Sequence, residues 1–130
     1  MKKHDVQNWL DEYGKAWIDG DPEQIVKLFV DGASYRETPF DESMKGLEEI
    51  RQYWQDGAAD AQEDVKFASQ VWAIDDYVAI AGWQASFTRK QSGKQVMLDG
   101  VFRLELFLSA SGLLCNRLEE WWHRQEICAS

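Results

Sequence analysis

Cysteine and histidine, which often indicate disulfides or metal sites, are scarce in this sequence of 130 residues. It contains only two cysteines, Cys115 and Cys128, and only two histidines, which lie near opposite ends of the chain. This set offers neither a disulfide framework nor the spacing of metal ligands, and no glycine-rich phosphate loop occurs. We therefore expect no metal, no cofactor, two reduced thiols and a cytoplasmic protein.

Long apolar runs and positive charge are also scarce. No stretch reaches the ~18 consecutive apolar residues that a membrane span requires, and no secretory signal opens the chain. Lys and Arg number 14 against 23 Asp and Glu, giving a formal net charge of −9 at pH 7. Nucleic acids and anionic membranes attract clustered positive charge, so we expect neither as a partner.

Aromatic residues, in contrast, are abundant. Hydrophobic residues make up 45% of the chain, and seven of its residues are tryptophan. A chain of this length has the size of one domain, and we expect residues 1–130 to form it. So many tryptophans must either be buried in its core or line a cavity.

The first half of the sequence has the apolar periodicity of helices. Apolar residues recur every three or four positions between Asp5 and Gly20, which predicts an amphipathic helix. Asp21 and Pro22 are typical of the start of a second, short helix that ends by Gly32. Residues 33–37 predict a brief strand, and residues 46–57 a third helix.

The second half has the pattern of strands. After Asp64 the helical period disappears, and β-rich runs are separated by turn residues at 75–76, 92–93 and 111–112. This order predicts an α+β fold in which N-terminal helices pack on a curved, mostly antiparallel sheet of four meandering strands.

The alternation of side chains along strands predicts which face of the sheet is buried. If Ser92-Gly93 is a two-residue turn, Trp83 lies opposite Phe102 and Phe87 lies opposite Leu98. The same counting across the next turn places Glu119 opposite Phe102. The predicted inner face carries Trp72, Trp83, Phe87, Leu98, Phe102, Leu104 and Trp121, interrupted by Gln70, Arg117, Glu119 and His123.

This face could either line a cavity or pack into a solid core. Small residues such as Ala81, Ala85 and Gly100 alternate with the bulky ones, which leaves room beside aromatic walls. With two tryptophans from the helices, the expected contacts for a small hydrophobic ligand are Trp17, Trp54, Trp72, Trp83, Phe87, Leu98, Phe102, Arg117 and Trp121.

The opposite face is predicted to mix apolar surface with charges of alternating sign. Its expected members are Asp99, Val101, Arg103, Glu105, Leu118, Glu120, Trp122 and Arg124. A surface with so many apolar residues is unusual in contact with water, and a surface with so many charges is unusual in a protein core. We expect a homodimer that packs through it.

The element order resembles that of the NTF2-like superfamily, and in particular its SnoaL-like and ketosteroid-isomerase-like members. The resemblance covers nearly the whole chain. It rests on Gly20-Asp21-Pro22, Ala33-Ser34-Tyr35 before Pro39, Leu98-Asp99-Gly100-Val101-Phe102-Arg103, and Leu118-Glu119-Glu120-Trp121-Trp122. It implies a cone-like α+β barrel that serves both as an enzyme scaffold and as a binding module.

The ketosteroid isomerases imply further roles through this resemblance. They use a carboxylate base together with a tyrosine and a protonated aspartate that bind the oxyanion. Counting from Gly20 places Tyr13 on the tyrosine and Glu37 on the base, whereas aligning the proline places Thr38 there. Gly100 falls on the protonated aspartate, so the oxyanion arrangement is incomplete in this chain.

Glu119 is the first candidate for chemistry from the residues themselves. On an apolar face its carboxyl would have a raised pKa, which suits proton transfer. The alternative is an ion pair with Arg117 or with His123 at the end of the sheet.

Three further residues are candidate catalytic groups, each with a structural alternative. His123 could act as a base or orient Glu119, or it could lie at a solvated strand end. Glu37 could be a base or an exposed turn residue, and Tyr13 an oxyanion donor or a core residue.

Two functions follow from these observations. The first is a cofactor-independent isomerase, cyclase, dehydratase or hydrolase that acts by general acid–base chemistry on a small hydrophobic, oxygenated molecule. The second is a module that binds a small ligand or dimerises without catalysis.

Overall fold

The computed structural model describes residues 1–127. The helices in this part are α1 Lys3–Asp19, α2 Pro22–Val26, α3 Leu47–Trp54 and the π-helix η1 Gln55–Ala59. The strands are β1 Phe29–Arg36, β2 Met44–Lys45, β3 Gln62–Asp75, β4 Val78–Arg89, β5 Gln95–Ser109 and β6 Gly112–Ile127. The predicted α+β order is confirmed.

Local chemistry sets the ends of the first two helices. The carboxylate of Asp5 accepts a hydrogen bond from the backbone N–H of Lys2 at 2.8 Å, so α1 begins before the predicted start. Gly20 ends α1 in the left-handed conformation, with φ at 64°, where glycine has no steric penalty. Asp21 then caps α2, and Pro22 occupies its first turn.

The segment after α2 differs from the prediction. The helix ends at Val26, and β1 begins at Phe29, four residues before the expected strand. The backbone N–H of Cys115 donates a hydrogen bond to the carbonyl of Leu28 at 2.8 Å. Pairing with a segment distant in the sequence therefore converts the expected end of the helix into strand. The short strand β2 was not predicted.

The strands form one six-stranded sheet in the order β2-β1-β6-β5-β4-β3. β1 runs parallel to β6, and every other neighbouring pair is antiparallel. The predicted meander of β3 to β6 is confirmed, but the sheet ends in separate edge strands, β2 and β3, and does not close into a barrel.

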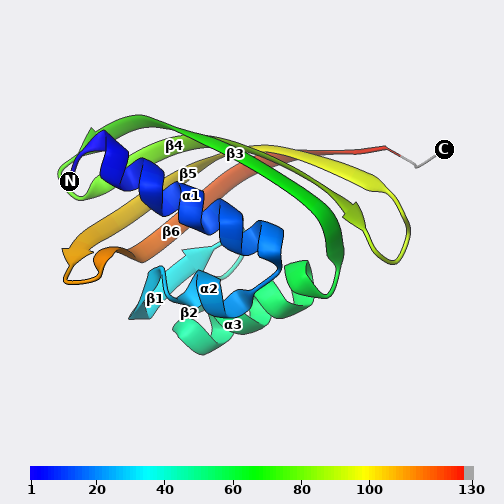
Figure 1. The fold of residues 1–130 in the computed structure, drawn as a ribbon, viewed down its shortest axis with the longest axis horizontal. Helices are drawn as coiled ribbons and strands as arrows, with labels where there is room; N and C mark the ends of the chain where they lie inside the picture. Colours follow the sequence, from blue (N-terminus) through cyan, green and yellow to red (C-terminus); the bar gives the residue numbers. More distant parts are fainter. Residues whose placement is uncertain (128–130) are drawn as a thin grey trace.

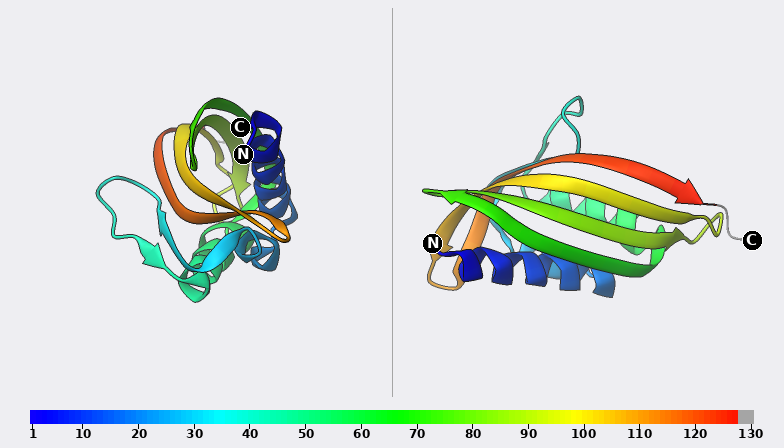
Figure 2. Two further views of the ribbon diagram at one scale, coloured as in Figure 1. Left: turned by 90° about the vertical axis from the view of Figure 1, so that its left-hand side faces the viewer. Right: turned by 90° about the horizontal axis from the view of Figure 1, so that it is seen from above.

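The sheet curves around the helices, as Figure 1 and the left view of Figure 2 show. We call the side covered by α1 and α3 the inner face and the opposite side the outer face. α1 packs along β3, and α3 packs against β1. The core fills the inner face, and its largest fully buried side chains include Trp83, Tyr13, Tyr35 and Phe102.

The β4–β5 hairpin keeps the predicted faces with a different register. Trp83 pairs with Gly100, and Ala81 pairs with Phe102, a shift of two residues from the expected pairs. The connection between these strands is longer than the two-residue turn assumed at Ser92-Gly93. A shift by an even number of residues leaves every side chain on its predicted face.

A β-bulge in β6 has the opposite effect. Leu106 pairs with Cys115, but Glu105 pairs with Arg117, so Asn116 is an extra residue on β6. Such an insertion turns every following side chain to the other face. From Arg117 onward, the predicted faces of β6 are therefore exchanged.

A second bulge lies between Val71 and Ala73 of β3 and leaves Trp72 as the extra residue. The Trp72 ring covers Gly82 on the outer face, and the side chain is 55% exposed. The prediction that Trp72 lies on the inner face is wrong for this reason.

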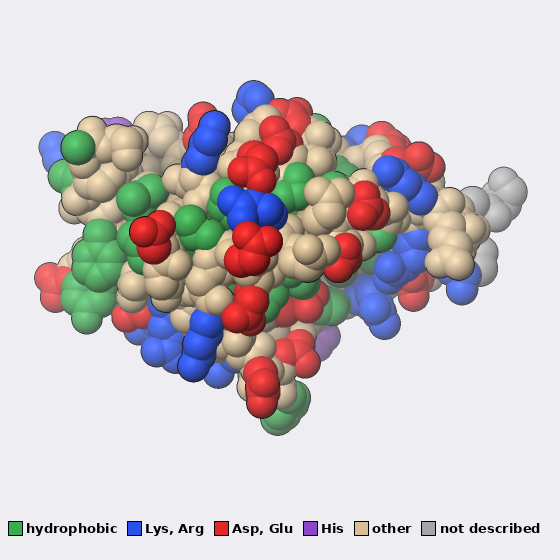
Figure 3. Space-filling view, turned by 90° about the horizontal axis from the view of Figure 1, so that it is seen from below, with side chains coloured by type: hydrophobic (Ala, Val, Ile, Leu, Met, Phe, Trp, Pro, Cys, Tyr) green, Lys and Arg blue, Asp and Glu red, His purple; other side chains and the backbone are tan. Residues whose placement is uncertain are grey.

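The surface seen from below carries acidic and basic side chains interspersed over its whole length (Figure 3). No helix in the described residues is long and apolar enough to cross a membrane.

Candidate functional site

The inner face encloses a cavity of about 200 Å³ between the sheet and the helices α1 and α3. Most of its wall is aromatic or small and apolar. These residues are Tyr13, Trp17, Tyr35, Tyr53, Trp54, Gly57, Ala58, Trp83, Phe87, Leu98 and Trp122. The other lining residues are charged or carry an amide: Glu37, Gln62, Arg89, Glu120 and Arg124.

Glu120 is the buried carboxyl group of this cavity. Only 5% of the residue is exposed. Burial raises the pKa of Glu120 well above its usual range, a hydrogen bond with Tyr35 opposes this shift, and the charge of Glu37 adds to it. A carboxyl group whose pKa is raised holds its proton to higher pH, and in that form it can donate a hydrogen bond or a proton to a ligand oxygen.

Two tyrosines extend this group into a short chain of hydroxyls. The hydroxyl oxygens of Tyr13 and Tyr35 lie 2.7 Å apart and are buried. Burial, followed by the charge of Glu120, raises the pKa of both tyrosines well above the usual range. Both tyrosines remain protonated. When Glu120 also carries a proton, the bonds of Tyr35 with Tyr13 and Glu120 use two of the three hydroxyl hydrogens, which leaves one hydrogen-bond donor for a ligand at the inner end of the cavity.

Glu37 is the second carboxyl group of the cavity and is half-buried just after β1. Burial raises its pKa, a hydrogen bond with the Tyr53 hydroxyl opposes the shift, and the charge of Asp41 adds to it. The indole N–H of Trp122 donates to the backbone carbonyl of Glu37 at 3.0 Å and ties this segment to β6. A carboxylate with a raised pKa is a stronger base than one in water.

The structure brings seven of the predicted site residues together around the cavity. They are Tyr13, Trp17, Glu37, Trp54, Trp83, Phe87 and Leu98. Phe102 lies behind this wall, with its ring centroid 5.3 Å from that of Tyr13 and 5.1 Å from that of Trp83. Their contact with a ligand stays a prediction.

The structure places the other five predicted site residues on the outer face. They are Trp72, Arg117, Glu119, Trp121 and His123. The bulges described above are the cause, because each reverses the alternation of one strand. Leu118, Glu120, Trp122 and Arg124, which were expected on the outer face, turn inward for the same reason.

Glu119 forms the ion-pair network that was its structural alternative. Its carboxylate pairs with Arg36, with Arg103 at 3.2 Å and with Arg117 at 3.4 Å. The Glu119 side chain is 8% exposed, whereas the three arginines are 25 to 49% exposed. One of the arginines also lies over a half-exposed indole, since the Arg36 guanidinium is 6.0 Å from the centroid of the Trp121 ring.

The sequence contained one signal for the true register of β6. Adjacent Glu119-Glu120 and Trp121-Trp122 place one glutamate and one tryptophan inward in either register, so these pairs could not decide it. The neighbours Arg117 and Leu118 could, because the bulged register buries Leu118 completely and leaves Arg117 half exposed.

Six further lining residues outside β6 lacked any such signal: Tyr35, Tyr53, Gly57, Ala58, Gln62 and Arg89. Tyr35 and Tyr53 lie on elements that the sequence predicts, but Tyr35 comes beside β6 through the parallel pairing of β1 with β6, and Tyr53 comes near it through the packing of α3 against β1.

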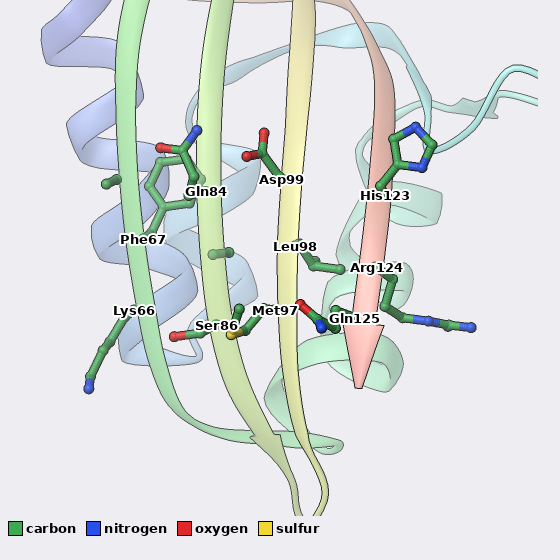
Figure 4. A pocket seen from close by; sticks show the side chains of 12 residues that line it. Lys66, Phe67, Gln84, Ser86, Met97, Leu98, Asp99, His123, Arg124 and Gln125 are labelled. Atoms are coloured by element: carbon green, nitrogen blue, oxygen red, sulfur yellow. The ribbon is translucent and has the colours of Figure 1, made fainter. Parts of the chain in front are cut away.

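A larger hollow of about 580 Å³ lies over the outer face (Figure 4). Gln84, Asp99 and His123 come to it from β4, β5 and β6, and Arg124 reaches past the edge of β6. Its lining includes neither of the buried glutamates, Glu119 and Glu120. We take the smaller cavity as the candidate site because it is enclosed and is lined by side chains that can transfer a proton.

Within residues 1–127, no group of three His, Cys, Asp or Glu side chains is placed to hold a metal ion. Cys115 is a buried thiol whose pKa is raised by burial, which makes it a poor nucleophile. Cys128 lies outside the described residues.

A model of the SnoaL-like domain matches residues 6–110 of this chain. No curated protein sequence matches it. Among solved structures, a Novosphingobium aromaticivorans protein provisionally described as an aromatic ring hydroxylase superimposes with a TM-score of 0.82 and 14% identity, covering 96% of this chain and 92% of that one.

Two other structures are similar. A hexachlorocyclohexane dehydrochlorinase, LinA type 2, has a TM-score of 0.79 and 8% identity, over 96% of this chain and 88% of that one. A ketosteroid isomerase-like protein from Erwinia carotovora atroseptica has a TM-score of 0.70 and 15% identity, over 91% and 93%. At these sequence identities the likeness shows a shared fold alone.

Proposed function

Because the chain belongs to the SnoaL-like domain family, we propose that its cavity catalyses proton transfer on a small, largely apolar, oxygenated molecule. The observation that carries this proposal is the pair of carboxyl groups, Glu37 and Glu120, that face one aromatic cavity with raised pKa values. Reactions named for similar structures, dehydrochlorination and isomerisation, can begin by removal of a proton from carbon.

The two carboxyl groups suit different roles. Glu37 is half-buried near the end of β1, and as the carboxylate it would take a proton from carbon. Glu120 is buried and its pKa is raised, and as the carboxylic acid it would donate a hydrogen bond to the oxygen on which negative charge develops. This division replaces the roles first predicted for Glu119 and His123, which lie on the outer face.

The size of the cavity limits the molecule. At about 200 Å³ it is smaller than the sites of ~300–1,000 Å³ that hold drug-sized ligands. A single ring with short substituents fits this limit, and the indoles of Trp17, Trp54 and Trp83 suit a flat apolar ring.

Deuterium exchange tests the proposal without knowledge of the product. Wild-type protein in D₂O should accelerate exchange of the α-hydrogens of small cyclic ketones, followed by NMR. Glu37→Gln should abolish the acceleration, and Glu120→Gln should reduce it about 100-fold. Glu119→Gln is the matched control on the outer face and should exchange at the wild-type rate.

The same experiment separates catalysis from binding alone. Equal exchange by wild type and Glu37→Gln would contradict the proposal. If the ketones still bound both proteins, the chain would be a non-catalytic binding module.

We further propose that residues 1–130 act as one domain and form a homodimer in the cytoplasm through the outer face. This face exposes Trp72, Met97 and Trp121 by 41 to 55%. Oppositely charged side chains are interspersed among them, so a twofold-related copy can offer matching charges.

Trp121→Lys should therefore shift the sedimentation coefficient toward that of a monomer. Trp121 is the tryptophan of β6 that lies on the outer face, whereas the bulge turns Trp122 inward. Ile18→Lys, on the exposed side of α1, is the control and should leave the sedimentation coefficient unchanged. A wild-type protein that sediments as a monomer would refute the dimer.

A further inference from the structure

The cavity has a cationic end. Arg89 on β4 and Arg124 on β6 both line it. Between them lies Glu126, whose pKa is held below its usual range by the hydrogen bond from Arg89 and then by the charges of Arg89, Arg124 and Lys94. Three cations thus surround one carboxylate, in a chain whose formal net charge is −9.

The partners of these arginines differ. The Nε atom of Arg89 donates to Glu126 at 2.6 Å, which fixes this guanidinium. The Nε atom of Arg124 lies 4.0 Å from the same carboxylate, beyond hydrogen-bond distance, and the side chain is 50% exposed. Arg124 therefore keeps donors and positive charge for a third group, while Glu126 is satisfied by Arg89.

The arginines and the proton-transfer groups lie at opposite ends of the cavity. Along β6, the inner face presents Glu120, Trp122 and Arg124 in succession, from fully buried to half exposed. Four residues of extended strand separate Glu120 from Arg124, a distance of about 13 Å. A molecule with one aromatic ring between two polar ends has the length to interact with both side chains.

The inner end also contains donors without acceptors. The indole N–H groups of Trp54 and Trp83 are buried and have no hydrogen-bond partner among residues 1–127. Buried donors of this kind normally find an acceptor. A ligand oxygen at this end would supply one, whereas an apolar end would leave both donors unsatisfied.

We propose that the ligand of this cavity is a small ring-bearing carboxylate, with the carboxylate held by Arg124 at the open end and an oxygen acceptor at the inner end. This inference rests on the proposed function, for which it names the substrate class. Arginine suits the role because its planar fork matches a carboxylate.

Isothermal titration calorimetry with matched probes tests the inference. Phenylacetate and phenylacetamide have the same shape and differ in charge, as do 3-phenylpropanoate and its amide. Wild-type protein should bind each acid at least about tenfold more tightly than its amide, and added salt should reduce the difference.

Two arginine variants on the same strand localise the effect. Arg124→Gln should remove the preference for the acid and leave the affinity for the amide unchanged. Arg117→Gln is the matched control, because Arg117 is 49% exposed, carries the same charge and faces outward. It should keep the wild-type preference, and circular dichroism should show that both variants are folded.

The possible failures are distinguishable. Equal affinity of wild type for acid and amide, or an unchanged preference in Arg124→Gln, would overturn the carboxylate inference and leave the deuterium-exchange test unaffected. A preference for acids without deuterium exchange would retain the ligand class and refute catalysis. No binding by any of the four probes at millimolar concentration would overturn the inference.

Discussion

Glu119→Gln should lower the free energy of unfolding by about 2 kcal/mol, whereas Glu120→Gln, one residue further, should raise it at neutral pH. Loss of one partner from a buried ion pair costs about 3–5 kcal/mol. The smaller value is expected here because Arg103 and Arg117 are a third to a half exposed and are partly screened by water.

The opposite sign for Glu120 follows from its raised pKa. The unfolded chain releases its proton near the ordinary value of 4.5, but the folded protein retains it to much higher pH. Between these two pKa values the unfolded state binds fewer protons, so wild-type stability falls as the pH rises, by up to about 1.4 kcal/mol per pH unit. A glutamine has no proton to release and removes this loss.

Urea denaturation of the three proteins between pH 4 and pH 8 measures both effects. The advantage of Glu120→Gln over wild type should be absent near pH 4 and grow with pH. Glu37 has a pKa raised in the same direction and is present in all three proteins, so it enters the comparison only through its charge, which adds to the raised pKa of Glu120. A destabilised Glu120→Gln at pH 8, or a Glu119→Gln as stable as wild type, would contradict the assignment of the two faces.

The second large effect concerns glycines that lie under tryptophans. Gly100→Ala should lower the free energy of unfolding by about 2 kcal/mol, because a Cβ there would lie 2.6 Å from the Trp83 ring and 2.9 Å from the carbonyl oxygen of Trp121. Trp83 is 1% exposed and stacks against Phe102, so it cannot move aside without disturbing the core.

Gly82→Ala is the matched control on the neighbouring strand. Its Cβ would lie even closer to a tryptophan, 2.2 Å from the ring of Trp72, but that side chain is 55% exposed and can rotate into solvent. The small gain from replacing a strand glycine should offset this rotation, for a net change within about 0.5 kcal/mol. If the two variants lost the same free energy of unfolding, the proposed difference in mobility between the indoles of Trp83 and Trp72 would be wrong.

Much of the fold could be predicted because its signals are local. The periodicity of α1, the Asp21-Pro22 start of α2 and the turn residues between strands each act over a few residues. The predicted faces of the β4–β5 hairpin were correct although the predicted turn was wrong, since a register shift of two residues keeps Trp83 and Phe87 on the inner face.

For the inward side chains of β6 the sequence offered one local signal, the preference of Leu118 over Arg117 for burial, and it does not locate the bulge. One extra residue, Asn116, exchanges the faces of all that follow, and its position depends on how β6 pairs with β5. The sequence alone determined part of the aromatic inner wall, including Tyr13, Trp54 and Trp83. Only the tertiary structure decided that Glu120 rather than Glu119 enters the cavity, because a bulge is fixed by pairing between strands and by the burial of Leu118.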